Sequence, residues 1–381
     1  MSLPSKQLAL RLYAPTSKGA RSEAKVERIL VPPRPSSSST DEIVLAEIQA
    51  AGFNRREEWS MMGAYPGLTY PSTMGCDAVA TIHGDKTGSR YIINPTVGWA
   101  SSAEAPEASV APASAEANEY GGKGFGILGG TKATNGEGTF QEYLWVRKAM
   151  LVPCPEHLTA TQAAALPCGG VTAYRALFTK GQVSSGKNVL ITGIGGGVAL
   201  LALRMAVAVG ANVYVTGGSQ EKIDYAVKAG AKGGANYKEK DWEKTIKGLL
   251  PKERSYLDTV IDSAGGGIVG SSIKSGLKDG GKIVIFGMTG GPKVEVTMRE
   301  VLKNVEVLGS TMGSLEEFKQ CVALVAKHKI VPDVDTTLDS LEKALDGFPL
   351  LADASKRSGG KVVMKIRPGA DQLPTTGSSK L

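Results

Sequence analysis

The stretch VLITGIGGGVALLALRMAVAVG (189–210) decides the fold class of this chain. Residues with the apolar character of a buried strand lead into a glycine-rich turn, and an apolar helical pattern follows the turn. The strand patterns NVYVT (212–216), TVIDSAG (259–265) and KIVIFG (282–287) come next. Short apolar strands joined by helices are typical of a parallel sheet that is covered on both faces. The pattern therefore predicts an α/β, doubly wound, dinucleotide-binding domain over residues 151–305.

The chain on either side of that domain lacks its alternation of apolar strands and helices. Short strand-like segments separated by turns come first, at residues 6–13, 25–31 and 42–51. After residue 305 the pattern becomes mixed again, so the end of the chain is expected to return to the first domain. A chain of 381 residues suits two domains. We therefore expect a discontinuous first domain of residues 1–150 and 306–366, and an exposed tail of residues 367–381.

Composition and charge exclude several classes of protein. The 44 Lys and Arg residues are scattered among 37 Asp and Glu residues, without a basic run that contains aromatic side chains, so we expect no nucleic-acid partner. The most apolar helical pattern, Val198 to Val209, is interrupted by Arg204 and is shorter than the about 20 residues that span a bilayer, so we expect no membrane partner. The N-terminus lacks the apolar segment of a signal peptide, and the cysteines lie far apart. Both features favour the reducing interior of a cell.

The glycine-rich turn is the predicted cofactor site. Its register is Gly193-x-x-Gly196-x-x-Ala199 rather than a strict GxGxxG. Glycine lets the chain turn sharply from strand to helix and lets a pyrophosphate approach the backbone N–H groups. A glycine-rich loop alone can be a flexible turn, but here a strand precedes it and a helix follows it. The context favours binding of a dinucleotide.

The charge at the end of the second strand indicates which dinucleotide is bound. NAD-specific folds place an acidic residue there to accept hydrogen bonds from the ribose hydroxyls. This chain has Thr216-Gly217-Gly218-Ser219 instead, with Lys222 one helical turn further on. An acid would repel a 2′-phosphate, whereas Ser219 donates a hydrogen bond and Lys222 adds a cation. We therefore expect NADPH as the cofactor, with an ordinary surface lysine as the alternative interpretation of Lys222.

Several motifs, in order along the chain, carry a resemblance to a known family. They are FNRREEWSMMGAYPGLTYPSTMGCDAVATI (53–82), INPTVGW (93–99), ALPCGGVTAYRALF (165–178), GANY (234–237) and FGMTGG (286–291). The chain resembles the zinc-free medium-chain dehydrogenase/reductases, which include quinone oxidoreductase-like and "zinc-type alcohol dehydrogenase-like" proteins. The resemblance implies a Rossmann domain, a GroES-like and mostly β catalytic domain, and an oxidoreductase activity.

The resemblance also assigns roles to individual residues. Those around the nicotinamide would be Asn54, Trp59 and Thr172. Those at the pyrophosphate would be Gly193, Gly196, Gly197 and Val198, and those at the 2′-phosphate would be Ser219, Lys222 and Tyr237. The remaining ribose and nicotinamide path would be lined by Ser263, Phe286, Gly287 and Thr289. Trp59 stands where a Tyr is common, and Arg175 follows the turn at Thr172, so the shape of the substrate pocket is left open.

Zinc alcohol dehydrogenases resemble this chain too, which raises the question of a catalytic zinc. Such a site needs three protein ligands and an open position. Asn54 stands at the position of the first cysteine ligand, while Cys76, Asp77 and Cys168 could make a set in principle. Residues 83–153 contain no cysteine for a structural zinc lobe. We therefore expect no metal, with Cys76 and Cys168 as small buried residues.

A site without a metal favours a conjugated acceptor as substrate. Hydride delivered to a quinone or to the β-carbon of an enone, enal or enoyl compound leaves a delocalised charge, so the site needs positioning, hydrogen-bond donors and a proton source. Tyr65 resembles the proton-donating tyrosine of the enoyl thioester reductases, and a packed tyrosine is the alternative. Asn54 is a second candidate for orienting the substrate carbonyl. An alcohol or aldehyde dehydrogenase, with or without zinc, and a non-catalytic NADPH-binding protein are the alternative functions.

The last residues, Ser379-Lys380-Leu381, form a peroxisomal address. They predict recognition by the peroxisomal import receptor and a location in the peroxisomal matrix, or otherwise in the cytoplasm. The resemblance further implies a possible homodimer, since relatives often pair through a sheet edge of the nucleotide domain.

Overall fold

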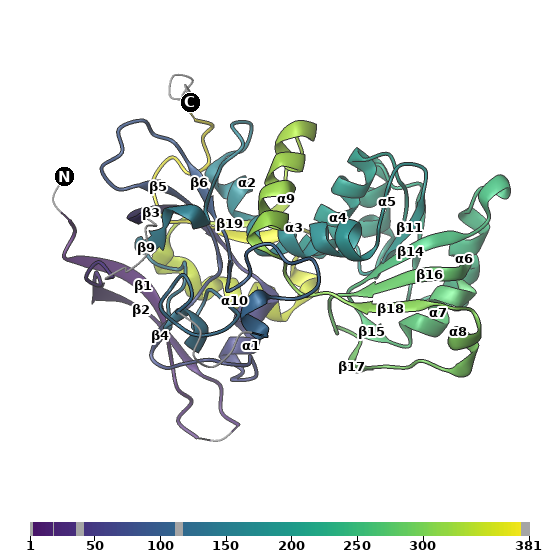
Figure 1. The fold of residues 1–381 in the computed structure, drawn as a ribbon, viewed down its shortest axis with the longest axis horizontal. Helices are drawn as coiled ribbons and strands as arrows, with labels where there is room; N and C mark the ends of the chain where they lie inside the picture. The colour runs from purple at the N-terminus through teal and green to yellow at the C-terminus, as the bar shows by residue number, and fades with distance from the viewer. Residues whose placement is uncertain (1–2, 18, 36–41, 111–116, 375–381) are drawn as a thin grey trace. The chain divides into compact units, whose positions relative to one another are not determined.

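The computed structural model describes residues 3–17, 19–35, 42–110 and 117–374. The chain divides into two compact units (Figure 1). The first unit comprises residues 1–168, 314–357 and 361–381, and the second comprises residues 169–313 and 358–360. The predicted import signal, Ser379-Lys380-Leu381, lies outside the described residues.

A six-stranded parallel sheet forms the centre of the second unit and confirms the predicted α/β, doubly wound fold. Its strands, from edge to edge, are β13 (Gly233–Asn236), β12 (Asn212–Gly217), β11 (Asn188–Ile191), β14 (Leu257–Asp262), β16 (Leu277–Ile285) and β18 (Glu306–Gly309). The helices of this unit are α4 (Gly197–Ala208), α5 (Gln220–Lys228), α6 (Trp242–Leu249), α7 (Ile268–Lys274) and α8 (Met298–Leu302). Every residue of β11 and β14 is buried, as expected for parallel strands that are covered on both faces.

A small two-stranded sheet and one continuous helical segment complete this unit. β15 (Gly265–Gly266) pairs with β17 (Gly291–Val294). α3 (Pro167–Tyr174) begins in the first unit and continues into a π-helix over Arg175–Lys180.

The first unit is mostly β, as the resemblance implied. Its larger sheet has the order β10 (Leu151–Pro153), β6 (Tyr91–Ile93), β5 (Asp77–Ile82), β3 (Ile43–Gly52), β20 (Lys361–Lys365) and β19 (Val334–Leu338), and β9 (Tyr143–Arg147) also pairs with β3. Its smaller sheets are β2 (Glu23–Leu30), β1 (Lys6–Tyr13) and β4 (Ser72–Thr73), and β7 (Thr96–Val97) with β8 (Gly126–Ile127). Its helices are α1 (Arg55–Met61), α2 (Ala160–Ala164), α9 (Leu315–His328) and α10 (Gly347–Ala352).

The core of the first unit lies between strands from both ends of the chain. Leu10, Phe53, Met74, Phe140 and Phe348 belong to one buried cluster, and the Phe53 and Phe140 ring centroids are 4.6 Å apart. Within the described residues, no helix is both long enough and apolar enough to cross a membrane.

The two units divide later in the chain than the expected boundaries at residues 150 and 305. β10 follows residue 150 but pairs with β6, and α2 packs against β3 and β5, so residues 151–168 belong to the first unit. β18 follows residue 305 but pairs with β16, so it extends the parallel sheet. Both differences arise because strand pairing, which local patterns do not reveal, assigns a short segment to its sheet.

Candidate functional site

Strand pairing brings three distant polar residues of the first unit together. β3 is antiparallel to both β5 and β20, with Gly52 opposite Asp77 on one side and Val363 on the other. In an antiparallel pair the end of one strand lies beside the start of its partner. The chain leaving β3 at Asn54 therefore meets Asp77 and Lys361, the first residues of β5 and β20.

The Asp77 carboxylate is fully buried, and both of its oxygens accept hydrogen bonds. Oδ2 lies 2.9 Å from Lys361 Nζ and 3.0 Å from Asn54 Nδ2, while Oδ1 accepts the backbone N–H of Cys168 at 2.8 Å. Burial, the largest single influence, opposes the charge on Lys361, but the attraction of Asp77 and a hydrogen bond to it, with smaller contributions, together raise the pKa of Lys361 above its usual value. The two groups therefore form a buried ion pair, the arrangement in which buried charges are tolerated.

The side-chain amide of Asn54 makes hydrogen bonds to three residues of this site. Its Nδ2 donates to Asp77 Oδ2 and, at 3.3 Å, to Cys76 Sγ, and its Oδ1 accepts a hydrogen bond from Lys361 Nζ. Asn54 was a candidate for orienting a substrate carbonyl. In the structure its amide bridges the ion pair and the Cys76 thiol, and its role toward a substrate carbonyl stays a prediction.

Two thiols lie beside the carboxylate. Ligand atoms of Cys76, Asp77 and Cys168 all lie within 4.8 Å of one another. Burial first, and then hydrogen bonding to Cys168 and the charge of Asp77, raise the pKa of the Cys76 thiol well above its usual value. Cys76 is therefore a neutral thiol, and its Sγ lies 3.6 Å from Asp77 Oδ1 as a weak donor.

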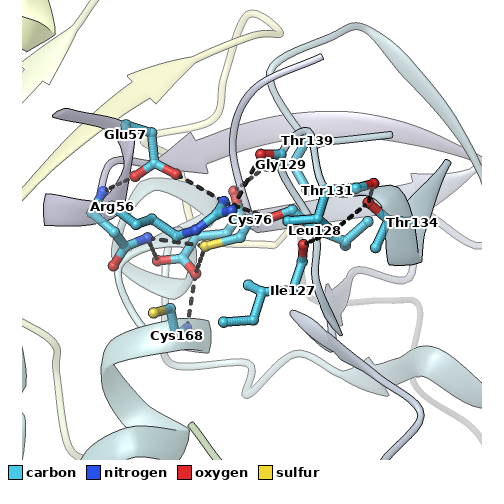
Figure 2. A network of polar contacts seen from close by, with 12 residues as sticks. Arg56, Glu57, Cys76, Ile127, Leu128, Gly129, Thr131, Thr134, Thr139 and Cys168 are labelled. Atoms are coloured by element: carbon cyan, nitrogen blue, oxygen red, sulfur yellow. Dashed lines mark hydrogen bonds and ion pairs between the residues drawn. The ribbon is translucent and has the colours of Figure 1, made fainter. Parts of the chain in front are cut away.

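A buried arginine on α1 lies next to the candidate proton donor. Arg56 donates to the carbonyls of Leu128 and Gly129 at 2.5 and 3.2 Å, and its Nη1 lies 3.3 Å from Glu57 Oε1. Figure 2 shows Arg56 extended between Glu57 and these two carbonyls, with Cys76 and Cys168 close by. The Arg56 Cζ lies 4.3 Å from the centroid of the Tyr65 ring.

Arg56 affects the pKa values of two neighbouring side chains, Glu57 and Tyr65. Burial raises the pKa of Glu57 to about 7, although the charge of Arg56 and the backbone N–H of Asn54 oppose the rise. Burial also raises the pKa of Tyr65, and the charge of Arg56 together with a hydrogen bond to it lowers that pKa in part. Tyr65 is therefore a protonated phenol at neutral pH, with a cation beside it.

In the second unit, the predicted glycine loop joins β11 to α4. Gly193 and Gly195 have φ values of 66° and 110°, in the left-handed region that favours glycine. A Cβ at Gly195 would lie 2.9 Å from Lys222 Cδ, so the loop backbone and this lysine are neighbours. Gly196 is the N-cap of α4, and Gly197 and Val198 form its first turn, whose N–H groups have no partner within the helix. These features fit a bound pyrophosphate.

The end of β12 forms a cradle of hydrogen-bond donors and cations. Ser219 is the N-cap of α5, and Lys222 follows in its first turn. A Cβ at Gly218 would lie 2.6 Å from Tyr237 Oη and 3.6 Å from Lys238 Cε, so both side chains reach over the backbone at this position. Ser219, Lys222 and Tyr237 were all predicted at this site, whereas Lys238 was missed. A cradle with this chemistry fits a phosphate.

The remaining predicted cofactor residues of the second unit form a neighbouring group. The Ser263 carbonyl accepts two hydrogen bonds from Thr289, one from its backbone N–H at 3.2 Å and one from the Thr289 hydroxyl at 3.1 Å. A Cβ at Gly287 would lie 2.6 Å from the Ser263 carbonyl, and one at Gly193 would lie 2.4 Å from the Ser263 hydroxyl. Phe286 donates its N–H to the Asp262 carbonyl at the end of β14. These residues therefore line the carboxyl ends of β11, β14 and β16, where open α/β sheets bind ligands.

The remaining two predicted residues are Thr172 and Trp59. Thr172, on α3 in the second unit, is buried, and its hydroxyl lies 3.7 Å from the sulfur of Met312. Trp59, on α1 in the first unit, is half-buried, and its carbonyl accepts the N–H of Ala64.

Comparison with known proteins identifies the family. Residues 40–156 match the alcohol dehydrogenase GroES-like domain, and residues 197–327 match the zinc-binding dehydrogenase domain. The chain is 40% identical over 339 residues to the zinc-type alcohol dehydrogenase-like protein YogA of Leptosphaeria maculans, a match that covers 85% of this chain and 90% of the relative. The chain belongs to the medium-chain dehydrogenase/reductase superfamily.

This medium-chain dehydrogenase/reductase is similar to proteins with several activities. It is 26% identical to the quinone oxidoreductase of Mus musculus, over 89% of this chain and 93% of the relative. It also matches a crystal structure of an NAD-dependent alcohol dehydrogenase, with a TM-score of 0.75 and 27% identity over 94% of this chain and 100% of the other. The chain is therefore an oxidoreductase with a GroES-like domain and a Rossmann-like sheet.

The family name raises the question of whether the first unit fits a catalytic zinc. Zinc needs ionised cysteines and free carboxylate oxygens as ligands. In this medium-chain dehydrogenase/reductase, both oxygens of Asp77 already accept hydrogen bonds, from Lys361, from Asn54 and from the backbone N–H of Cys168. The Lys361 ammonium lies beside the same carboxylate, where it would repel a divalent cation. As arranged, these residues do not fit a catalytic zinc.

Sequence reasoning missed three residues of these sites in this medium-chain dehydrogenase/reductase. Lys361 lies 284 residues from its partner Asp77, and nothing in GGKVVMK marks it as part of a site. Arg56 is one of two adjacent arginines, and only the phase of α1 makes it the buried one. Lys238 could have been found, because it follows the predicted Tyr237 directly.

Proposed function

We propose that this oxidoreductase is an NADPH-dependent, zinc-independent reductase of quinones or of α,β-unsaturated carbonyl compounds. The observation that carries the proposal is the group formed by Asn54, Asp77 and Lys361, in which Lys361 neutralises the Asp77 carboxylate. We call it the closed group around Asp77. Without a Lewis acid, a simple ketone or alcohol loses the main stabilisation of its alkoxide. A conjugated acceptor spreads the charge itself, so the chain needs only to position it and supply a proton.

The residues of the first unit supply that proton in this proposal. When bound, NADPH supplies the hydride. Tyr65 is protonated at neutral pH and has a cation against its ring, so it can release a proton to the reduced acceptor. The similarity to a mammalian quinone oxidoreductase supports a conjugated acceptor as the substrate class.

The preference for NADPH rests on the cradle at the end of β12 and has a direct test. Lys222→Ala should weaken NADPH binding roughly 10- to 100-fold, because a charge-assisted hydrogen bond contributes about 1.5–3 kcal/mol. NADH binding should change little, since NADH has no 2′-phosphate. The measurement is the Kd for each nucleotide by calorimetry. Lys228→Ala, an exposed lysine on the same helix, is the matched control. An equal loss of affinity for NADPH and NADH in the variant, or a wild-type chain that binds NADH more tightly than NADPH, would contradict this assignment.

A screen of NADPH oxidation with the wild-type chain tests the reaction. The acceptors are quinones, enals and enoyl thioesters, with simple ketones and aldehydes as controls, each with and without a zinc chelator. We expect turnover of at least one conjugated class, unchanged by the chelator, and little turnover of the controls.

The same screen separates the two alternative functions. An alcohol or aldehyde dehydrogenase that uses zinc would reduce the simple carbonyls and lose this activity with the chelator. A non-catalytic NADPH-binding protein would bind the nucleotide and turn over none of the acceptors. Either result would overturn the proposal.

A further inference from the structure

The side chain of Arg56 is held unusually firmly for an arginine. It is 7% exposed, and it lies on α1 directly after the turn at Asn54. Its guanidinium contacts the carbonyls of Leu128 and Gly129 and the carboxylate of Glu57, so both terminal nitrogens have fixed partners (Figure 2). The planar guanidinium loses little freedom once such bonds are made. Arg56 is therefore a buried cation held in one position by its hydrogen bonds, rather than a mobile surface side chain.

The guanidinium of Arg56 lies over one aromatic ring. Arg56 Cζ lies 4.3 Å from the centroid of Tyr65, well within the about 6 Å of a cation–π contact. Tyr65 is only half-buried by surface area, and a loop carries it, so the chain around it does not fix its ring as a helix or strand would. Arg56 is thus a cation in direct contact with this ring.

The backbone around Arg56 is arranged to admit the guanidinium. Gly129 has a φ of 103°, and a Cβ at this position would lie 2.1 Å from Arg56 Nη1. Any other residue would therefore displace the arginine. Thr131 secures the same loop, because its hydroxyl donates to the Ile127 carbonyl at 2.9 Å.

We propose that Arg56 is the positioning residue of the reduction, which holds Tyr65 in place and stabilises the tyrosinate left when Tyr65 gives up its proton. This inference rests on the proposed function. In the step concerned, the O–H bond of Tyr65 breaks and the proton joins the enolate or quinol oxygen, or the α-carbon, of the acceptor that has received hydride. Solvent then returns a proton to Tyr65, so hydride and proton together reduce the acceptor by two electrons.

The charges around Tyr65 agree with this role. Burial raises the pKa of Tyr65, and Arg56, the cation next to the phenol, lowers it. Glu57 neutralises part of the arginine charge from the side opposite the loop carbonyls.

The decisive experiment is a double-mutant cycle on kcat with the acceptor found by the screen. Arg56→Met should lower kcat at least about 10-fold, since a desolvated cation–π contact and the lost charge both act on Tyr65. In a Tyr65→Phe background the same substitution should lower kcat less than about 2-fold, because residues that act as a unit are not additive. A multiplicative loss in the double variant would assign Arg56 a purely structural role and overturn the proposal.

A second measurement needs no turnover, so it separates this proposal from the proposed function. Alkaline absorbance titration of the folded chain, with Tyr65→Phe subtracted, gives the pKa of Tyr65. We expect this pKa to rise by about 1 unit or more in Arg56→Met and to change little in Arg56→Lys, which keeps the charge. Arg55→Met, at the exposed neighbouring arginine, is the control and should leave kcat and the titration unchanged. An unshifted Tyr65 in Arg56→Met overturns the proposal even if the chain reduces enals. If the methionine variant does not fold, Arg56→Gln takes its place with the same expected results.

Discussion

Tyr65→Phe is expected to lower kcat with a conjugated acceptor by about 100- to 10,000-fold, the range that general acid catalysis supplies. The substitution removes only the hydroxyl, so the ring still stacks on Arg56 and the fold is unchanged. Because Tyr65 gives its proton after the acceptor is bound, KM and the Kd for NADPH should change by less than about 3-fold. Steady-state kinetics and nucleotide titration of the purified variant provide both values.

The pH profile distinguishes this role from one in packing. A general acid is active when protonated, and burial raises the pKa of Tyr65 above its usual value of 10.0. The wild-type rate that depends on Tyr65 should therefore stay level from neutral pH to beyond about 10 and fall only at higher pH. Tyr70→Phe is the matched control, because the Tyr70 hydroxyl contacts Ser22 in the same unit. Undiminished enal reduction by Tyr65→Phe would remove Tyr65 from the reaction.

The nucleotide half of the molecule was predictable because its determinants are local. A strand, a glycine turn and a helix follow one another in residues 189–210, and the geometry of a βαβ unit then sets where Ser219 and Lys222 lie. The structure places both at the start of α5, as predicted.

The centre of the first unit was not predictable, because it depends on pairing between segments far apart in the sequence. Asp77 was considered only as a possible metal ligand, and its partner Lys361 lies on a strand whose register with β3 no local pattern specifies. The ion pair places an ammonium beside Asp77, and this cation is the observation that argues against Cys76, Asp77 and Cys168 as a ligand set. Arg56 was missed for a related reason, since the chain packed over α1 decides which of two adjacent arginines is buried.

The same ion pair gives the second large prediction. Asp77→Asn should lower the free energy of unfolding by about 3–5 kcal/mol, because it leaves the Lys361 ammonium buried without its counter-charge. Urea denaturation at pH 7 measures this loss. Asp339→Asn is the control: its side chain is 71% exposed and its ion pair with Lys365 spans 3.8 Å, so we expect a change below about 1 kcal/mol.

The size of the loss in Asp77→Asn does not by itself show that the pair stabilises the fold, since most of it is the cost of one charge left alone. The double variant Asp77→Asn with Lys361→Met removes both charges, so it should recover at least about half of the loss. The raised pKa of Lys361 also fixes the pH range of the effect: the stability that the ion pair contributes is present below the usual lysine value of 10.5 and is lost as the pH rises through the higher value in the folded chain. The difference between wild type and Asp77→Asn should therefore be largest near pH 6 and shrink as the pH rises toward about 10.5, because burial that Asp77 no longer opposes lowers the pKa of Lys361 in the variant. A single variant as stable as the wild type would mean that Lys361 releases its proton at little cost, and the closed group around Asp77 would then no longer argue against a cation at this site.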